Sequence, residues 1–542
     1  MTADPRYNVL SILRDVAARV PDRPALVMEE TSRRESRISF AGLWERIDRA
    51  SVGLRRLGLQ PGERAIVMIP MSIDLYVALL ALLKIGVVAV FVDPWIGWRQ
   101  IAAFAAFAEP RGYLGIPKSH LLRLLSGRLR GIPITVTTGS RLGPFPARHT
   151  LSDLEEEPGD GHVHPVLPDD PALITFTSGS SGEPKGANRT HGFLVAQHRA
   201  LSAELPAEDG DVDMPMFPVF ALNNLANGVS SVVPAMDFRR VDRVDAARVL
   251  RQMNANRVTT CTASPPFFDR LAERIAKAPG EAPHLRRLLT GGAPVSDAQL
   301  ATWTRALPGP EILVAYGSTE AEPVAHLSAE ERLEAASDIH LKSPGYCVGR
   351  PVERVRTKVI RIHPGPVELG EGGWTDWELP PGEVGELVVT GEHVCRDYYK
   401  NPQAVRENKI ADVDGAVWHR MGDTGYFDGQ GRFWIAGRVH STIRRRGGLV
   451  HPQLVEQAAR GVDPRIRRAA AVGLPVGEGD EKVVLVVESD AGEELKEEVI
   501  ARLAAAGMPA DEIVVTADPL PVDPRHNSKI DYRRLREQLE NR

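Results

Sequence analysis

The chain has 542 residues, of which 43% are hydrophobic and 25% are charged. This length exceeds what one hydrophobic core can organise, so about two to four domains or subdomains are expected, and the composition is ordinary for a globular protein. The formal net charge of -5 provides no electrostatic case for nucleic-acid binding, which needs a basic surface.

Neither targeting nor membrane insertion is predicted. The N-terminus lacks a charged stretch followed by an apolar one, so no signal peptide is expected. The most apolar segment, residues 76–92, is interrupted by Lys84 and Gly86 and is too short to span a bilayer. The three cysteines are widely spaced without a C-x-x-C pair, which argues against a disulfide framework or a zinc site. We therefore expect a cytoplasmic protein.

The first part of the chain alternates between helical and strand patterns. Helices are expected at residues 9–18, 40–57, 75–83, 245–253 and 265–275. Strands are expected at residues 25–28, 65–69, 87–92, 112–116, 134–137, 257–261 and 285–290. A polar, proline-bearing linker is expected at residues 153–171. This alternation predicts an α/β fold with parallel sheets.

The pattern changes after residue 382. Short strand-like runs at residues 386–389 and 432–436 predict a small β subdomain. The last part of the chain combines strands at residues 469–473, 483–487 and 513–516 with a helix at 493–505, enough for a separate α+β domain. We therefore divide the chain into a large N-terminal domain, residues 1–437, and a smaller C-terminal domain, residues 438–542.

A loop of small, hydroxylated and glycine residues follows the apolar run at residues 174–176. Glycines let the main chain approach an anion closely, backbone N–H groups form an anion-binding nest, and hydroxyl groups add donors. The loop predicts a polyphosphate site made by Thr177, Ser178, Gly179, Ser180, Ser181, Gly182 and Lys185. It is not a Walker A loop, because Glu183 and Pro184 separate Gly182 from Lys185. A flexible turn is the alternative for such a loop taken alone.

Four further segments follow in order. They are G-G-A-P from Gly291, Y-G-S-T-E from Tyr316, R-M-G-D-T-G-Y from Arg420, and P-V-D-P-R-H-N-S-K ending at Lys529. Together with the loop, they resemble the acyl-adenylate-forming superfamily, which includes acyl-CoA synthetases, nonribosomal-peptide adenylation domains and luciferases. The resemblance implies that Mg2+ and ATP are used to convert a carboxylic acid to acyl-AMP, with release of pyrophosphate.

The resemblance also implies roles for the Y-G-S-T-E segment. Tyr316 would stack on adenine, Thr319 would bond the α-phosphate, and Glu320 would hold Mg2+, which one or two carboxylates and substrate phosphates commonly bind. Gly317 and Ser318 belong to the same nucleotide segment. A turn with an exposed acid is the alternative for this segment alone.

Three other segments complete the implied site. Gly291, Gly292 and Ala293 would let adenine and the acyl group pass close to the backbone. Asp423 would accept hydrogen bonds from the ribose hydroxyls, and Arg438 would contact ribose or phosphate. Lys529 would bind the carboxylate and the bridging oxygen and stabilise charge, with Glu320 and Thr177 as further catalytic residues.

In the family, the C-terminal domain swings between the two half-reactions. The pivot lies two places after the arginine of a Gly-Arg pair and is often Asp or Lys. In this chain His440 stands at that place. The resemblance implies a mobile C-terminal cap that carries the catalytic lysine, and His440 leaves its regulation open.

The acid and its acceptor are the subject of a finer resemblance. Residues 217–225, F-P-V-F-A-L-N-N-L, stand where acyl-CoA and aryl-CoA ligases usually carry P-L-F-H, with Ala221 in place of the histidine. This run and the approach to Lys529 are similar to the β-lactone synthetases of olefin biosynthesis. Those enzymes act on long-chain 2-alkyl-3-hydroxy acids, whose hydroxyl closes on the activated carboxyl. The residues expected to contact the acid are His191, Phe217, Phe220, Ala221, Leu222 and Gly317; the aromatic ones could instead be core.

Other chemistries stay as alternatives. A ligase that forms a thioester with CoA or a carrier protein is one alternative, because Gly447 and Gly448 keep a glycine-bearing turn. Neighbouring pathway enzymes are further candidate partners. A non-catalytic nucleotide-binding homologue is disfavoured by the presence of both Glu320 and Lys529. The spacing around Cys347 imitates a hydrolase elbow without its strand-to-helix context, and V-G-x-P turns recur here in adenylating enzymes.

Two other groups of residues are expected to be solvated rather than functional. They are the histidines His162 and His164, and the arginines Arg444, Arg445 and Arg446, although the arginines lie where a CoA phosphate could be met.

Overall fold

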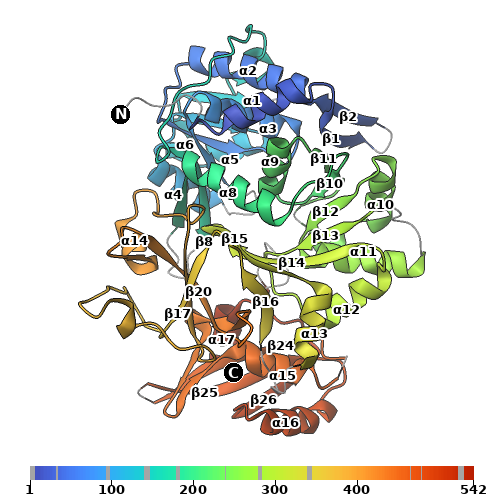
Figure 1. Ribbon diagram of the computed structural model, residues 1–542, viewed down its shortest axis with the longest axis vertical. Coiled ribbons are helices and arrows are strands. Elements are labelled where there is room, and N and C mark those ends of the chain that lie inside the picture. Colours follow the sequence, from blue (N-terminus) through green and yellow to red (C-terminus); the bar gives the residue numbers. More distant parts are fainter. Residues whose placement is uncertain are drawn as a thin grey trace.

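The computed structural model places two β-sheets and a C-terminal lobe along the long axis of the molecule (Figure 1). It describes residues 7–31, 34–92, 98–139, 147–178, 184–238, 240–278, 284–338, 345–463, 465–477, 479–522 and 530–541. The α/β class and the parallel sheets predicted from the sequence are confirmed.

The first sheet has the strand order β7-β6-β5-β3-β4-β8-β9. All neighbours in it are parallel except β8 and β9, which form an antiparallel hairpin at one edge. Both faces are covered, which explains the mostly apolar sequences of its central strands β3, β4 and β5. The bounds are β3 Arg64–Met68, β4 Val88–Phe91, β5 Gly112–Gly115, β6 Ile134–Thr137, β7 His149–Thr150, β8 Pro171–Ser178 and β9 Pro184–Thr190.

The second sheet begins as a parallel α/β sheet and continues into the predicted β subdomain. Its order is β17-β18-β20-β21-β16-β15-β14-β13-β12-β10-β11-β1-β2, with β19 paired to β20. Its first strands are β1 Pro24–Thr31, β2 Arg34–Ser39, β10 Val212–Pro215, β11 Ser230–Val233, β12 Thr260–Ala263, β13 Arg287–Thr290 and β14 Glu311–Ser318. The rest are β15 Ala321–Ser328, β16 Tyr346–Pro351, β17 Arg356–Ile360, β18 Gly385–Thr390, β19 Lys409–Ala411, β20 Val417–Phe427 and β21 Phe433–Arg438.

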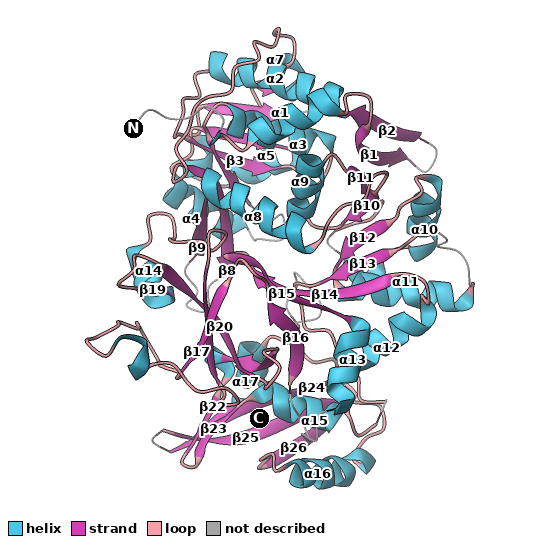
Figure 2. Ribbon diagram, in the orientation of Figure 1, coloured by secondary structure: helices cyan, strands magenta, loops and turns pink. Residues whose placement is uncertain are grey.

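Helices fill the space between the two sheets and cover their outer faces (Figure 2). The inner helices pack into one core with both sheets: α1 Leu10–Arg19, α2 Phe40–Arg56, α3 Ile73–Lys84 and α9 Pro218–Asn227. α4 Trp98–Ala108, α5 Pro117–Leu124 and α6 Gly127–Arg130 contribute to the core on the outside of the first sheet. Those outside the second sheet are α10 Ala246–Ala255, α11 Pro265–Lys277, α12 Asp297–Ala306 and α13 Ala329–Asp338. Three more are α7 Leu151–Leu154, α8 His191–Glu204 and α14 Pro402–Asn408.

The C-terminal lobe has its own cores, at the end of the molecule opposite to α1 and α2 (Figure 1). Its elements are β22 Ile443–Arg445, β23 Gly448–Val450, α15 Pro452–Arg460, β24 Arg468–Gly477, β25 Asp480–Glu488, α16 Glu494–Ala506, β26 Glu512–Thr516 and α17 Tyr532–Glu540. Gln457 joins the lobe to the rest through Gly345, since its amide donates to the Gly345 carbonyl at 3.0 Å and its carbonyl accepts from the Gly345 N–H at 2.9 Å.

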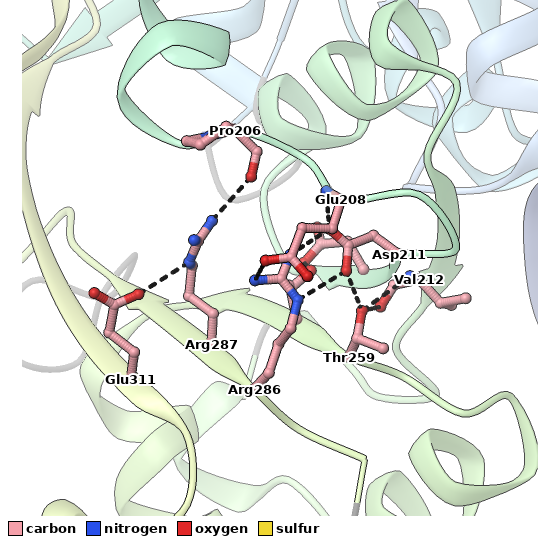
Figure 3. Close-up of polar contacts among 10 residues, drawn as sticks. Pro206, Glu208, Asp211, Val212, Thr259, Arg286, Arg287 and Glu311 are labelled. Carbon is pink, nitrogen blue, oxygen red and sulfur yellow. Dashed lines mark hydrogen bonds and ion pairs between the residues drawn. The ribbon is translucent and has the colours of Figure 1, made fainter.

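An ion-pair cluster at the amino ends of β10, β12 and β13 ties the parallel strands together (Figure 3). Arg286 donates to both carboxylate oxygens of Asp211 and lies 3.0 Å from Glu208. The hydroxyl of Thr259 donates to Asp211 at 2.8 Å. Burial alone would raise the pKa of Asp211, but the hydrogen bonds, first of all from Arg286, outweigh it and hold that pKa below its usual value.

The Asp211→Asn variant is expected to be less stable by about 2 kcal/mol at neutral pH, because a charge-assisted pair at a buried carboxylate is lost. Because the folded-state pKa is depressed, the stabilisation is present above the unfolded pKa of about 3.9 and disappears as pH falls through the folded value. Chemical denaturation at neutral and acidic pH measures both effects. The Asp209→Asn variant, whose side chain is 92% exposed, is the control and should change little. A difference between Asp211→Asn and wild type that persists unchanged in acid contradicts this reasoning.

Candidate active site

Three side chains from different strands meet where β14 approaches β20 and β21. The Tyr316 hydroxyl donates to Oδ2 of Asp423 at 2.7 Å, and Nη1 of Arg438 donates to Oδ1 at 2.7 Å. Asp423 and Arg438 are direct cross-strand partners in the β20–β21 register. The structure therefore unites the Y-G-S-T-E segment with both later segments, although more than a hundred residues separate them in sequence.

Burial and mutual charge raise the pKa values of two members of this triad. The negative charge of Asp423 raises the pKa of Arg438, and burial followed by the same charge raises the pKa of Tyr316 well above its usual range. The carboxylate itself is buried, whereas the Arg438 side chain is 47% exposed. A buried anion with two fixed donors and a cation at the surface is suited to binding a polar ligand.

Glu320 is held by the segment at residues 394–398, whose role the sequence analysis missed. The buried Tyr398 hydroxyl donates to Oε1 of Glu320 at 2.9 Å, and the Cys395 N–H donates to the Glu320 carbonyl at 2.7 Å. Lys409 lies 5.0 Å from the centre of the Tyr398 ring and donates to the Cys395 carbonyl. The neighbouring carboxylate and burial together keep Tyr398 protonated, with burial as the larger cause of its raised pKa.

The same segment bridges the two sheets next to the predicted phosphate loop. Isolated bridges pair Ala321 of β15 with Val394 and Ala187 of β9 with Tyr398. Its sequence carries no glycine or charge pattern of a ligand site. Two adjacent tyrosines, one of them Tyr398, were the available signal.

Lys185 is buried on β9 at the base of the phosphate loop. It pairs in register with Thr177 of β8, and its Nζ donates to Oδ1 of Asn408 at 3.4 Å. The Asn408 carbonyl in turn lies 3.3 Å from Nδ1 of the buried His419. Burial first, and then the charge of Lys409, hold the pKa of His419 well below its usual value.

Part of the phosphate loop lies outside the described residues: Gly179, Ser180, Ser181 and Gly182, as does Lys529. Thr177 and Ser178 are placed at the end of β8. Arg189 of β9 pairs in register with Leu173 near the start of β8, and its Nε and Nη2 donate to the carbonyl of Thr319 at 3.1 and 2.7 Å. The Y-G-S-T-E segment thus contacts β9, the strand that follows the predicted phosphate loop.

The glycine turn after β13 lies against β14 and the apolar cluster beyond it. A side chain at Gly291 would approach the Ala315 carbonyl to 2.9 Å, and Gly292 has φ +78° with Phe217 beside it. A side chain at Gly317 would similarly meet the Ala321 carbonyl at 2.7 Å. Glycine is needed at these positions for close backbone approach and for left-handed φ. Ala293 follows in the same turn.

Apart from Gly317, the residues predicted to contact the acid divide into three groups. Phe217 and Phe220 join a cluster over β13 and β14, together with Leu289 and Leu313. Ala221 is fully buried in the helical core between the sheets, and Leu222 packs against that core.

His191 lies apart from the other predicted acid contacts. Its Nδ1 accepts from the Val9 N–H at 3.4 Å, and burial lowers its pKa to about 4. Among the described residues predicted to contact the acid, Phe217 lies beside Gly292 of the glycine turn, and Phe220 belongs to the same cluster as Phe217.

The structure also places the rival site at Cys347 and the two histidines that were expected to be solvated. Cys347 is buried in β16, where a strand rather than the predicted turn is found, and burial raises its pKa to about 11, which disfavours a nucleophile. His164 is only partly exposed, because its ring packs against Gly86, while His162 is exposed.

Arg445 and Arg446 of the triple-arginine run are paired with Asp511 and Asp480. Within the described ranges, no group of three His, Cys, Asp or Glu residues gathers as a metal site. In the same ranges no helix reaches the length and apolar character that crossing a bilayer requires.

The family model described as AMP-binding enzyme matches residues 13–399. The chain belongs to the AMP-binding enzyme family and is an acyl-adenylate-forming ligase.

Individual relatives extend the comparison along the whole chain. An olefin β-lactone synthetase of Stenotrophomonas maltophilia is 34% identical, with 92% of this chain and 90% of that protein covered. A putative acyl-CoA ligase of Bacillus subtilis, YdaB, is 27% identical over 88% of this chain and 90% of its own length. The fold matches the crystal structure of ATP-bound MatB from Rhodopseudomonas palustris with a TM-score of 0.80, at 23% identity and with 99% of each chain covered.

Proposed function

We propose that this ligase activates a long-chain 3-hydroxy carboxylic acid as acyl-AMP and then closes it to a β-lactone. The observation that carries the proposal is the similarity to olefin β-lactone synthetase along nearly the whole chain. Ala221 supports it, because this position in α9 holds no imidazole and is fully buried in the core.

ATP would lie across the triad and the phosphate loop. In this arrangement Asp423 accepts hydrogen bonds from the ribose hydroxyls, and Arg438 contacts ribose or phosphate. One face of the Tyr316 ring is stacked on Phe433, with ring centres 6.2 Å apart, and the other face would take adenine. Thr319, together with the backbone and hydroxyl groups of residues 177–182, would bind the phosphates.

Glu320 would hold Mg2+. The fit rests on its carboxylate, which is buried and bonded through Oε1 to Tyr398, while no donor among the described residues bonds Oε2. When bound, the metal would neutralise phosphate charge, and substrate phosphates would complete its oxygen ligands.

In the first half-reaction a carboxylate oxygen of the acid attacks the α-phosphorus of ATP. The bond from that phosphorus to the bridging oxygen breaks, and pyrophosphate leaves. Lys529 would stabilise the charge on the bridging oxygen. In the second half-reaction the 3-hydroxyl oxygen attacks the acyl carbon, loses its proton, and AMP leaves. Because this attack is intramolecular, it gains from effective molarity and needs no thiol.

The domain arrangement belongs to the same proposal. Residues 1–437 would form the adenylation domain, and residues 438–542 the cap that carries Lys529. The boundary coincides with the end of β21, and the proposed pivot His440 follows in a 3-10 turn at Val439–Ser441, with its side chain exposed. We place the enzyme in the cytoplasm.

Product analysis tests the proposal. The enzyme is incubated with ATP, Mg2+ and a 3-hydroxy fatty acid, with and without CoA, and the products are identified by mass spectrometry. Lactone formed without CoA supports the proposal. Thioester formed only with CoA, with acyl-AMP alone in its absence, supports a CoA ligase instead. Pyrophosphate release that needs no acid contradicts both.

The CoA or carrier-protein ligase is the second candidate because of one observation. Gly448 has φ +130° at the tip of the β22–β23 hairpin, next to Gly447, so this glycine-bearing turn supports the ligase alternative. It would offer a narrow surface to a pantetheine arm.

The Tyr398→Phe variant is expected to need about 10-fold more Mg2+ for half-maximal adenylation, because the partner that orients the Glu320 carboxylate is lost. Pyrophosphate release measured against Mg2+ concentration reports this shift. The control is Tyr399→Phe, which removes a hydroxyl from the adjacent tyrosine and should leave the Mg2+ dependence unchanged. Equal dependence in both variants would contradict a metal-linked role.

A further inference from the structure

Helix α5 exposes leucines on the surface of the molecule. Leu121, Leu124 and Leu125 at its C-terminal end are 44%, 36% and 61% exposed. Their spacing places them on one helical face, which we call the leucine face. Scattered single exposed leucines are normal, whereas a contiguous apolar face with no covering element marks an interaction site.

The same helix buries polar side chains, which is the reverse of an ordinary surface helix. Ser119, His120 and Arg123 are buried. Nε2 of His120 lies 3.1 Å from the Val136 carbonyl, and Nη1 of Arg123 donates to the Arg130 carbonyl at 3.4 Å. Because Leu122 and these polar groups already hold the inner side of α5, packing of the helix does not account for leucines on the outer side.

Positively charged residues flank the leucine face on both sides along the chain. Residues 110–152 contain seven Lys and Arg residues and no Asp or Glu, in a chain with a net charge of -5. Lys118 precedes the face, and Arg128 and Arg130 follow it on α6; all three are exposed. No carboxylate among the described residues forms an ion pair with any of these three cations.

We propose that the leucine face and its three cations dock the enzyme on an anionic lipid surface. Apolar side chains enter the boundary of the acyl chains while basic ones meet the headgroups, and the two contributions together set the strength of peripheral binding. Charge complementarity selects the anionic surface over a neutral one. The docking is independent of the chemistry at the active site, since it needs neither ATP nor acid.

Vesicle sedimentation of the full chain tests the docking. Wild type is mixed with phosphatidylcholine vesicles that contain about 30% phosphatidylglycerol, and with pure phosphatidylcholine vesicles. We expect binding to the anionic vesicles that exceeds binding to the neutral ones by at least about 10-fold and that falls in about 0.5 M salt. Equal binding to both kinds of vesicle, or binding to neither kind, overturns the proposal. Binding to neither kind would indicate that the leucine face binds a protein partner instead.

Two sets of substitutions locate the surface. The triple variant Leu121→Ser, Leu124→Ser, Leu125→Ser removes the apolar part, and the matched control places serine at Leu167, Val476 and Ile500, which are also exposed. The face variant is expected to lose at least about 10-fold in vesicle affinity, and the control none. Wild-type affinity in the face variant contradicts the assignment.

The charge variant keeps the test decisive if the leucine variant misfolds. Lys118→Gln, Arg128→Gln and Arg130→Gln together are expected to lower affinity by about fivefold per cation removed. The control removes three other exposed cations, Arg251, Lys277 and Arg305. Pyrophosphate release with a short water-soluble acid should stay at the wild-type rate in every variant. Equal losses in the charge variant and its control would show nonspecific electrostatics and overturn the proposed surface.

Discussion

The Lys529→Ala variant is expected to adenylate about 100- to 1000-fold more slowly than wild type, with little change in ATP affinity. The reason is that a preorganised cation opposite the bridging oxygen acts mainly on charge that develops as pyrophosphate leaves. Pyrophosphate release under saturating ATP and acid measures the rate, and equilibrium binding of ATP measures the affinity.

The control for this prediction is Lys496→Ala in the same lobe. Lys496 forms an exposed ion pair with Glu493 at 3.1 Å, which contributes little. We expect wild-type turnover in this control. Turnover by Lys529→Ala within a few-fold of wild type would contradict a catalytic role for this lysine. That conclusion does not depend on whether the enzyme forms a β-lactone.

The central parallel strands β3, β4, β5 and β6 were predictable because each is a short, mostly apolar run whose residues are nearly all buried. Residues 134–137 were expected as a strand and form β6 with all four residues buried. The run at 346–349 was not expected as a strand, because Gly345 and Gly349 imitate a turn. In the fold these glycines have positive φ and let β16 lie against the carbonyls of Ile435 and His326.

Lys84 shows what the sequence pattern could not reveal. It interrupts the apolar segment at 76–92 and was expected only to disfavour a membrane span. In the fold it is fully buried, with Nζ 2.7 Å from Asp48 and 3.1 Å from the Ser51 hydroxyl. A buried lysine needs such partners, and they come from α2, which periodicity along α3 alone cannot identify.

The site follows the same division. Residues in glycine-rich segments, such as Asp423 and Gly291, could be predicted for the site because those segments carry the family resemblance. Tyr398 and Arg189 were missed, because their contacts with Glu320 and Thr319 join segments far apart in the chain. Buried polar groups acquire such roles through tertiary hydrogen bonds, which leave no periodic trace in the sequence.

The Asp423→Ala variant is expected to raise the KM for ATP by about 10- to 100-fold, because charge-assisted hydrogen bonds to the ribose would be lost. The substitution also leaves the Tyr316 hydroxyl without its acceptor and Arg438 without its anion. Steady-state kinetics against ATP measures the change. The control, Asp414→Asn, alters an exposed carboxylate in the same subdomain that lies 3.4 Å from Arg356, and should leave KM unchanged.

A double-mutant cycle with Tyr316→Phe separates the direct loss from the unpaired hydroxyl. The phenylalanine keeps a ring for adenine but removes the donor to Asp423. We expect Tyr316→Phe alone to have a smaller effect on KM than Asp423→Ala. The double variant should be less impaired than the product of the two single effects, because the hydroxyl that Asp423→Ala leaves unpaired is then absent. Independent effects would mean that the 2.7 Å contact between Tyr316 and Asp423 does not couple them, and an unchanged KM in Asp423→Ala would exclude the carboxylate from nucleotide binding.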